Sequence, residues 1–252
     1  MENKKFGLSA FSLKMIAIVC MTLDHTMVIW SGSFDPLLVS VLRSIGRFTF
    51  PIMVFLLTEG YVYTSNRVRY AGRLFLFAIL SMLPFCMMDG KPWNVLFTLF
   101  VGLVLLMLKD DVVDRFCEVD ARIWTVVFLL LSAVISWFLK ECDWGFAGIL
   151  IIYAAGQISN RKVRAVLISL GLFAGAIFKV CVMQGFDSFT QYSMIFYSGL
   201  LVSFIPMLFY NGERGKSYWI ISKYAFYAYY PAHIFVLCMI YLVSANGFSV
   251  FL

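Results

Sequence analysis

The feature that most constrains this chain is its series of long apolar segments, which are separated by short polar connections. A helix needs about 20 mostly apolar residues to cross a bilayer. Nine segments approach this length, near residues 12–31, 46–64, 72–88, 94–108, 122–139, 145–158, 164–182, 193–210 and 224–244. The sequence therefore predicts an all-α, polytopic transmembrane helix bundle of about nine spans. We expect residues 1–252 to form a single integral membrane domain.

The composition excludes the other broad classes of protein. Hydrophobic residues make up 62% of the chain and charged residues 13%, against about 45–50% and about 25% in soluble domains. A soluble domain of this length could not bury so much apolar surface, which excludes a soluble enzyme, a disordered chain and a secreted disulfide scaffold. The apolar runs are continuous rather than alternating, which excludes a transmembrane β-barrel.

The distribution of basic residues predicts which way the bundle faces. If the N-terminus is cytoplasmic, five of the 20 Lys and Arg residues lie toward the outside and the other 15 toward the cytoplasm. The outer five are Arg43, Arg47, Lys91, Lys140 and Lys179. Cytoplasmic loops of membrane proteins carry an excess of Lys and Arg, so we predict a cytoplasmic N-terminus. The net charge of +6 then reports orientation, and no nucleic-acid partner is expected.

Ionisable side chains inside the spans are candidates for function, because each costs about 2.5–3.5 kcal/mol to place in a bilayer. Asp24 and His25 lie deep in the first span, and the chain has only two histidines. Lys14 shares a helix face with His25, about 16 Å away along the axis. His is well suited to proton transfer near neutral pH. The alternative is a structural His bonded to a neighbouring helix, with Lys14 reaching the membrane interface.

The second predicted span carries three more charged residues, Arg43, Arg47 and Glu59. Arg43 and Arg47 are four residues apart and therefore lie on one face. Arg47 and Glu59 are more than three turns apart, so they cannot pair with each other. We expect each to have its own partner on another helix, and Asp24 is the predicted partner of Arg47. A buried ion pair with a purely structural role is the alternative.

A third group, Arg67, Arg69 and Arg73, lies at the predicted cytoplasmic end of the third span. Guanidinium groups bind phosphate through forked hydrogen bonds, so the group suits a phosphate-rich ligand. The alternative is that these arginines only specify orientation.

Two further polar groups lie toward the outer side. Asn94 and Thr98 are one turn apart at the start of the fourth span. Asp143 opens the sixth span, where the alternative role is a helix N-cap. The six cysteines and two histidines are not at metal-ligand spacing, so no metal site is predicted.

In the last span, Tyr230 comes directly before Pro231, and the second histidine, His233, comes two residues after it. A proline inside a helix leaves the carbonyl four residues earlier, here that of Tyr227, without its partner. A kink beside a buried histidine favours a functional role over an interfacial belt of tyrosines. Together these groups predict a polar cavity between the first, second and last spans, with the third, fourth and sixth spans contributing, a basic cytoplasmic mouth and two histidines inside.

In the order and spacing of these residues the chain resembles the TraX family, membrane proteins associated with N-acetylation of conjugative pilin. The resemblance covers nearly the whole chain. It rests on residues 21–25, 45–51, 58–61, 70–74, 83–85, 94–98 and 230–233, and on Asp143 with Gly145 and Gly148. One departure is Trp144, where the family pattern has a tyrosine. More distantly, Lys14 and His25 are similar to the Arg/Lys-x10-His pattern of acyltransferase-3 membrane enzymes.

The resemblance implies an acetyltransferase in the bacterial inner membrane. It would move an acetyl group from cytoplasmic acetyl-CoA to an amine or hydroxyl at or beyond the membrane. The acceptor would be a pilin N-terminus or other peptide, a carbohydrate or a small molecule. The partners implied are the acyl-CoA donor and the lipid bilayer, and a homo-oligomer stays open.

Residues and resemblance together suggest one mechanism. His25 acts as general base on the acceptor, and Asp24 orients a neighbour such as Arg47. Asn94, Tyr230 or His233 stabilises the oxyanion. The arginines of the third span, with Lys14, hold the phosphates. A covalent acetyl-histidine relay stays open.

Two other classes of function compete with this reading. A proton-coupled transporter would also use buried His, Asp, Glu and Arg, although no inverted repeat is visible. A scaffolding subunit would need fewer buried charges.

Overall fold

The computed structural model describes residues 6–116, 120–183, 185, 190–215 and 219–246. Two features of the sequence determine where its helices begin. Short polar side chains accept hydrogen bonds from the first turn: Ser9 from the backbone N–H of Ser12, and Asn94 from that of Leu96. Proline opens α2 at Pro36. Three of the 15 basic residues that we predict on the cytoplasmic side lie outside the described residues: Lys4, Lys5 and Lys216.

All regular secondary-structure elements in the described residues are helices. The elements are α1 (Ala10–Ile29), η1 (Ser31–Ser33), α2 (Pro36–Gly46), α3 (Thr49–Tyr63), α4 (Arg67–Leu80), α5 (Met82–Asp89), α6 (Val95–Arg115), α7 (Ala121–Phe138), α8 (Gly145–Gly156), α9 (Arg161–Met183), α10 (Gln191–Val202), α11 (Phe204–Leu208) and α12 (Trp219–Asn246). This confirms the all-α prediction for the part of the chain that the structure describes.

Six helical segments of the described residues are long and apolar enough to cross a membrane. They are Ala10–Ile29, Pro36–Tyr63, Ala121–Phe138, Arg161–Val182, Gln191–Leu208 and Tyr224–Ala245. The pair α4 and α5, bent by 48°, makes a seventh if it counts as one broken span. The other two predicted segments are also helical, but α6 ends in a charged stretch and α8 has 12 residues.

The second span begins earlier than predicted. We expected it near residue 46, whereas α2 begins at Pro36 and continues, after a break at Arg47 and Phe48, into α3. The prediction was wrong here because Ser40 and Arg43 interrupt the apolar run, so α2 is amphipathic. Its polar side faces α1, where Asp24 lies.

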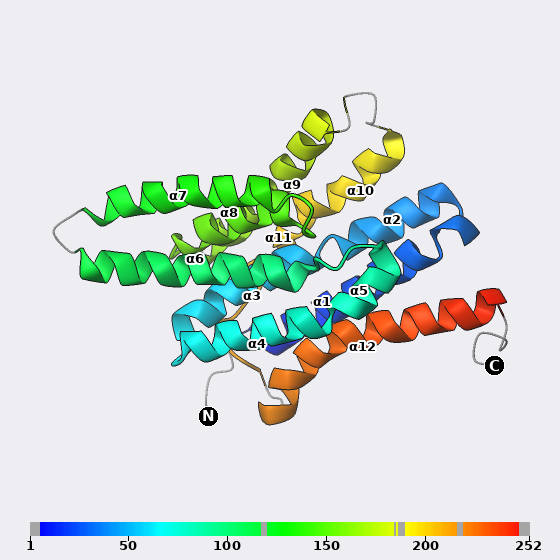
Figure 1. Ribbon diagram of the computed structural model, residues 1–252, viewed down its shortest axis with the longest axis horizontal. Helices are drawn as coiled ribbons and strands as arrows, with labels where there is room; N and C mark the ends of the chain where they lie inside the picture. The colour runs from blue at the N-terminus through cyan, green and yellow to red at the C-terminus, as the bar shows by residue number, and fades with distance from the viewer. Residues whose placement is uncertain (1–5, 117–119, 184, 186–189, 216–218, 247–252) are drawn as a thin grey trace.

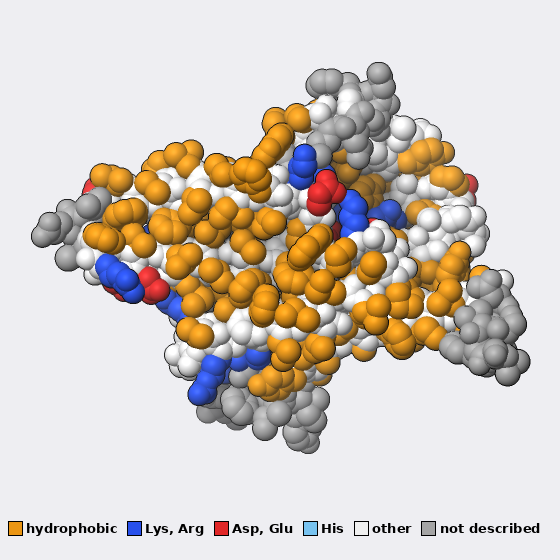
Figure 2. All heavy atoms as spheres, in the orientation of Figure 1, with side chains coloured by type: hydrophobic (Ala, Val, Ile, Leu, Met, Phe, Trp, Pro, Cys, Tyr) orange, Lys and Arg blue, Asp and Glu red, His pale blue; other side chains and the backbone are white. Residues whose placement is uncertain are grey.

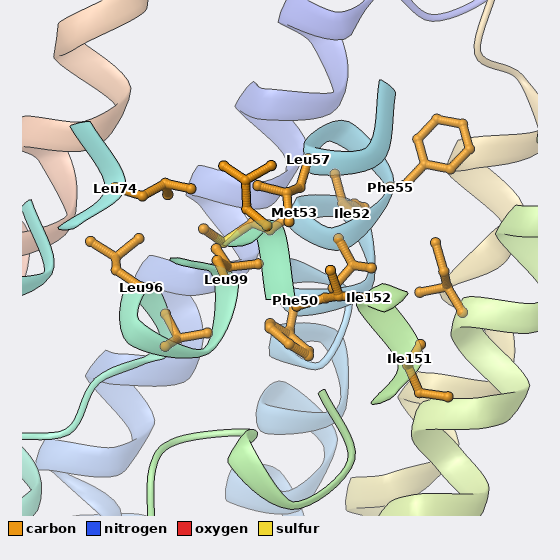
Figure 3. Close-up of a cluster of buried hydrophobic side chains, with 14 of the residues drawn as sticks. Phe50, Ile52, Met53, Phe55, Leu57, Leu74, Leu96, Leu99, Ile151 and Ile152 are labelled. Atoms are coloured by element: carbon orange, nitrogen blue, oxygen red, sulfur yellow. The ribbon is translucent and has the colours of Figure 1, made fainter. Parts of the chain in front are cut away.

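Helix α3 lies at the centre of the bundle and contacts α1, α6, α8, α9 and α11. Ten of its 15 residues are buried. Figure 3 shows its apolar side chains, among them Phe50 and Met53, meeting side chains of α4, α6 and α8. In Figure 1, α6 and α7 lie side by side in green, and α12 in orange and red runs along α4 and α5.

The outer surface of the bundle is apolar. Large hydrophobic side chains are exposed along α7, including Ile123, Leu130 and Phe138. Figure 2 shows hydrophobic side chains over most of one face, with the charged ones gathered in a few patches. Such a surface is favourable against lipid and costly in water, in agreement with a multi-pass membrane protein.

Candidate functional site

The first candidate group joins α1 to α2 through ion pairs. Asp24 is buried and accepts hydrogen bonds from Arg43 Nε, at 3.1 Å, and from Arg47 Nη2. The spacing of four residues on α2 brings both guanidinium groups to one carboxylate. The predicted pair between Asp24 and Arg47 is therefore present. A Cβ at Gly46 would lie 2.4 Å from the Asp24 Cβ, so only glycine permits this approach of the two helices.

Two aromatic rings cover the guanidinium groups. Arg47 lies 4.6 Å from the ring centroid of Phe196 on α10 and 5.4 Å from that of Trp144. Arg43 lies 4.8 Å from the same Phe196 ring. These cation–π contacts stabilise charges that are shielded from water. Neither ring was predicted as a site residue, because aromatic residues are 18% of the chain and Trp144 stood out only as a departure from the family pattern.

The two histidines form a hydrogen-bonded pair across α1 and α12. His25 Nδ1 lies 2.8 Å from His233 Nε2, and His233 Nδ1 lies 2.7 Å from the backbone oxygen of Tyr229. A carbonyl oxygen only accepts, so His233 Nδ1 carries a proton. In a neutral His233, Nε2 then accepts from His25 Nδ1–H. This arrangement leaves His25 Nε2 with a free lone pair, which is what a general base requires.

Tyr229 supplies the backbone acceptor for His233, one turn before it on α12. Tyr229 also stacks on the His233 ring, with centroids 4.8 Å apart, and its hydroxyl lies 2.7 Å from Thr22 Oγ1. Tyr229 thus holds His233 in place and ties α12 to α1.

A small cavity of about 40 Å³ lies beside His25. It is lined by Met21, Asp24, His25, Gly46, Arg47, Thr49, Phe50, Met53, Val95, Asp143, Trp144 and Tyr230. Five of the predicted site residues therefore meet at one cavity, and His233 and Arg43 contact two of them. One water-sized group needs about 10–15 Å³ on this scale, so the cavity has room for about three heavy atoms.

Asp143 reaches the cavity from the connection between α7 and α8. Its backbone N–H donates to the Trp93 carbonyl at 3.0 Å, and its own carbonyl accepts from Thr98 Oγ1 at 2.6 Å. The N-cap of α8 is Trp144, without a side-chain bond, so Asp143 is not the N-cap that we had considered. Burial raises the pKa of its carboxyl to about 6, although the nearby Arg47 guanidinium opposes this.

Tyr230 is a second polar group on the cavity wall. Its hydroxyl is buried, and no described residue accepts a hydrogen bond from it, whereas the backbone N–H of Val95 lies close to its oxygen. A buried hydroxyl without an acceptor costs free energy, and here it lies on the same wall as His25 and Val95. The hydroxyl is therefore available to a group that enters the cavity.

Asn94 and Thr98 lie behind the cavity rather than on its surface. Asn94 caps α6 by accepting from Leu96 N–H, and its Nδ2 donates to the Ala78 carbonyl at 2.9 Å. Thr98 holds the backbone of Asp143. Both residues position cavity elements, and neither contributes to the cavity lining.

Glu59 belongs to a separate group at the other end of α3. It is buried, it pairs with Arg164 Nη2, and it accepts from Arg161 Nε at 3.0 Å. Arg161 also donates to the Tyr63 hydroxyl at 2.8 Å. The expectation that Glu59 pairs with a residue other than Arg47 is confirmed. In the sequence its two partners on α9 count only among the basic residues on the predicted cytoplasmic side, so this ion pairing was not predicted.

The predicted arginine group at the start of α4 is divided among different contacts. Arg67 forms an ion pair with Asp110 at 2.9 Å, Arg69 is exposed, and Arg73 lies 5.6 Å from the Tyr70 ring centroid. Lys14 is half-buried, with Nζ 5.6 Å from the centroid of Phe226 on α12. Within the described ranges, no three or more His, Cys, Asp or Glu side chains are grouped to hold a metal ion.

Comparison with known proteins gives two matches. A family model described as TraX protein matches residues 9–241. The chain is also similar to the probable fimbrial assembly protein FimC, serogroup H1, of Dichelobacter nodosus. The two are 31% identical over 255 residues, which cover 94% of this chain and 97% of that protein. No solved structure matches the chain. On these findings, the chain belongs to the TraX protein family.

Proposed function

We propose that this protein is a membrane-embedded acetyltransferase, which moves an acetyl group from cytoplasmic acetyl-CoA to an amine or hydroxyl acceptor at or beyond the membrane. The observation that carries the proposal is the free lone pair of His25 Nε2 beside a cavity with room for about three heavy atoms. An acetyl group has three heavy atoms. The name of the similar fimbrial assembly protein favours a fimbrial subunit as the acceptor.

The proposal includes a topology of nine spans in a bacterial inner membrane, with the N-terminus in the cytoplasm. Each of the nine predicted segments coincides with a helix or a helix pair. In Figure 1, the α1–α2 connection and the far end of α12 lie at one end of the bundle, and the start of α4 at the other. Alternate crossings would produce this arrangement. The excess of basic residues assigns the α4 end to the cytoplasm.

In the proposed reaction, the amine nitrogen or hydroxyl oxygen of the acceptor molecule attacks the thioester carbonyl of acetyl-CoA. His25 Nε2 takes the proton from that nitrogen or oxygen at the same time. The C–S bond breaks as the tetrahedral intermediate collapses. The thiolate of CoA then takes the proton from His25 and leaves as the thiol. The proton on His25 Nδ1 stays hydrogen-bonded to His233 Nε2 throughout, so the positive charge is stabilised by a partner already in place.

Two cavity groups are suited to the negative charge that develops on the carbonyl oxygen. The Arg47 guanidinium is held by Asp24, and the Tyr230 hydroxyl donates to no described residue. Donors placed before the reaction stabilise an oxyanion without further reorganisation. Asp24 and His25 are adjacent in α1, so their side chains point about 100° apart and Asp24 cannot hold His25. Asp24 therefore acts through Arg47.

The cavity is too small for the pantetheine arm, which would approach from the cytoplasmic end of α1. Lys14, three turns before His25 on the same face, the arginines of α4 and Arg214, whose carbonyl accepts from the Phe11 backbone N–H, are basic groups at that end. Of the α4 arginines, Arg67 and Arg69 are exposed, and Arg67 is already paired with Asp110. We assign the phosphates of acetyl-CoA to Lys14, Arg69 and Arg73, with Arg67 if its bond to Asp110 opens.

One observation favours a second function, a proton-coupled transporter. The hydrogen-bonded series of His25, His233 and the Tyr229 carbonyl resembles part of a proton path. Binding of acetyl-CoA separates the two functions, because a carrier for another solute has no reason to bind it.

The test is a calorimetric titration of the purified protein in detergent with acetyl-CoA and with CoA. Wild type should bind acetyl-CoA, and the double variant Arg69→Ala/Arg73→Ala should bind it about tenfold or more weakly, as expected when charge-assisted bonds are lost. Arg122→Ala, an exposed arginine at the start of α7, is the matched control and should bind like wild type. Absence of binding by a folded, monodisperse wild type would reject the acetyltransferase and favour the transporter.

A further inference from the structure

Trp144 has an unusual backbone conformation at the cavity. Its φ is 60° and its ψ is 5°, which is the left-handed region. In the described part of the chain, every other residue with positive φ is a glycine. A bulky side chain in this region is strained, and such strain persists only where the surroundings enforce it. We therefore expect the indole side chain to make contacts that glycine or asparagine at this position could not make.

The contacts of the indole indicate what the conformation achieves. The ring stacks on Phe50, with centroids 4.8 Å apart and planes within 15°, and it covers the Arg47 guanidinium. It also forms part of the cavity wall that includes His25. The left-handed turn thus directs a large rigid side chain into the site, directly before α8 begins.

The size of the cavity depends on its apolar side chains. These are Met21, Phe50, Met53, Val95 and Trp144. Phe50 is buried and packed within the central cluster around α3, whereas Trp144 is half-buried and comes from a short connection. Of these side chains, Trp144 is the largest, and its removal would enlarge the cavity most without disturbing a membrane-spanning helix.

We propose that Trp144 determines the length of the acyl group that this protein accepts, and that it restricts the donor to acetyl-CoA. The inference rests on the proposed acetyltransferase function. In this proposal the acetyl methyl group lies against the indole, which lines the cavity, so a propionyl or butyryl chain would collide with it. Replacing the indole by hydrogen opens that space and relieves the backbone strain, because glycine adopts positive φ freely.

The test compares acyl-CoA esters of increasing length. Purified wild type, Trp144→Gly and Trp144→Tyr are titrated with acetyl-, propionyl- and butyryl-CoA by calorimetry, and release of CoA thiol is followed with an amine acceptor. Wild type should prefer acetyl-CoA over butyryl-CoA by tenfold or more. Trp144→Gly should reduce this ratio toward one, and Trp144→Tyr, which keeps a ring, should retain most of the preference.

Two further variants keep the test decisive. Trp144→Asn replaces the indole by a small side chain that tolerates positive φ, so it substitutes for the glycine variant if that fails to fold. Trp93→Ala removes an exposed tryptophan that does not line the cavity, and should leave the ratio unchanged. A folded Trp144→Gly or Trp144→Asn with the wild-type ratio would overturn the inference and leave the acetyltransferase intact. A wild type that binds none of the esters would overturn both.

Discussion

His25 Nδ1 and His233 Nε2 lie 2.8 Å apart, although 208 residues separate them in the chain. Because the Tyr229 carbonyl fixes a proton on His233 Nδ1, this one distance assigns the protons of both rings. The basic nitrogen, His25 Nε2, belongs to the ring that lines the cavity. The pair therefore joins proton chemistry to the space where a small group can be bound.

His233 should act as a positioning residue for His25. Replacing His233 by Ala removes the acceptor that orients the His25 ring, and we expect kcat to fall by about 10²-fold, at the low end of the range for general acid–base catalysis. The affinity for acetyl-CoA should not change, since His233 does not line the cavity. His233→Gln offers an amide oxygen as acceptor and should recover part of the lost kcat.

Steady-state kinetics and calorimetry on the same preparations check this prediction. Equal losses of kcat in the Ala and Gln variants, or a loss of donor affinity in both, would mean that His233 only supports the packing of α12.

Asp24 should be essential for stability as well as for positioning. Asp24→Asn leaves Arg43 and Arg47 without their shared counter-charge at a buried site. Breaking a buried ion pair by removal of one partner costs about 3–5 kcal/mol. We expect a large drop in the thermal unfolding temperature in detergent. Glu141→Gln breaks an exposed ion pair with Lys91 and should leave the unfolding temperature unchanged.

Gly46 tests the close approach of α1 and α2. An Ala Cβ there would lie 2.4 Å from Asp24 Cβ and 2.8 Å from its Cγ, so the carboxylate or the helix must move. Overpacking of this kind costs about 1–3 kcal/mol. Gly72→Ala in α4 is the matched control, because nothing lies within 4 Å of the added Cβ. It should stabilise the protein by about 0.5–1 kcal/mol. If both variants unfold at the wild-type temperature, the two helices are less constrained than the structure indicates.

The sequence predicted the ion pairs better than it predicted the cavity. Helical spacing was enough to reject a pair between Arg47 and Glu59, because that inference depends on one helix. Asp24 was suggested as the partner of Arg47 because both residues lie toward the predicted outer side of their spans. The bond between His25 and His233 depends on which helices are neighbours, and apolar periodicity does not encode this in a bundle surrounded by lipid. Trp144 is a site residue through its contact with Arg47, its place in the cavity wall and its left-handed backbone conformation, none of which a sequence pattern indicated.

Asp143 should make stability depend on pH. Burial raises the pKa of its carboxyl from 3.8 to about 6, so the folded state holds a proton that the unfolded state has lost between these values. The stabilisation is complete below about pH 4 and disappears as the pH rises through about 6, a change of about 3 kcal/mol. Asp143→Asn removes this dependence. Its unfolding temperature relative to wild type should therefore rise between pH 4.5 and pH 7.5.

Thermal unfolding of the two proteins in the same detergent at several pH values gives this difference. A difference that stays constant over the range would show that the Asp143 carboxyl titrates at its ordinary pKa, and that Arg47 outweighs the effect of burial.

The most direct measurement supplies radiolabelled acetyl-CoA to inverted membrane vesicles from cells that produce wild type, His25→Ala or Glu141→Gln, and counts the label in membrane protein and carbohydrate. Wild type and Glu141→Gln should incorporate equal label. His25→Ala, present at the same level and folded, should incorporate about 100-fold less. Incorporation by His25→Ala at the wild-type rate would contradict the assignment of His25 as the general base.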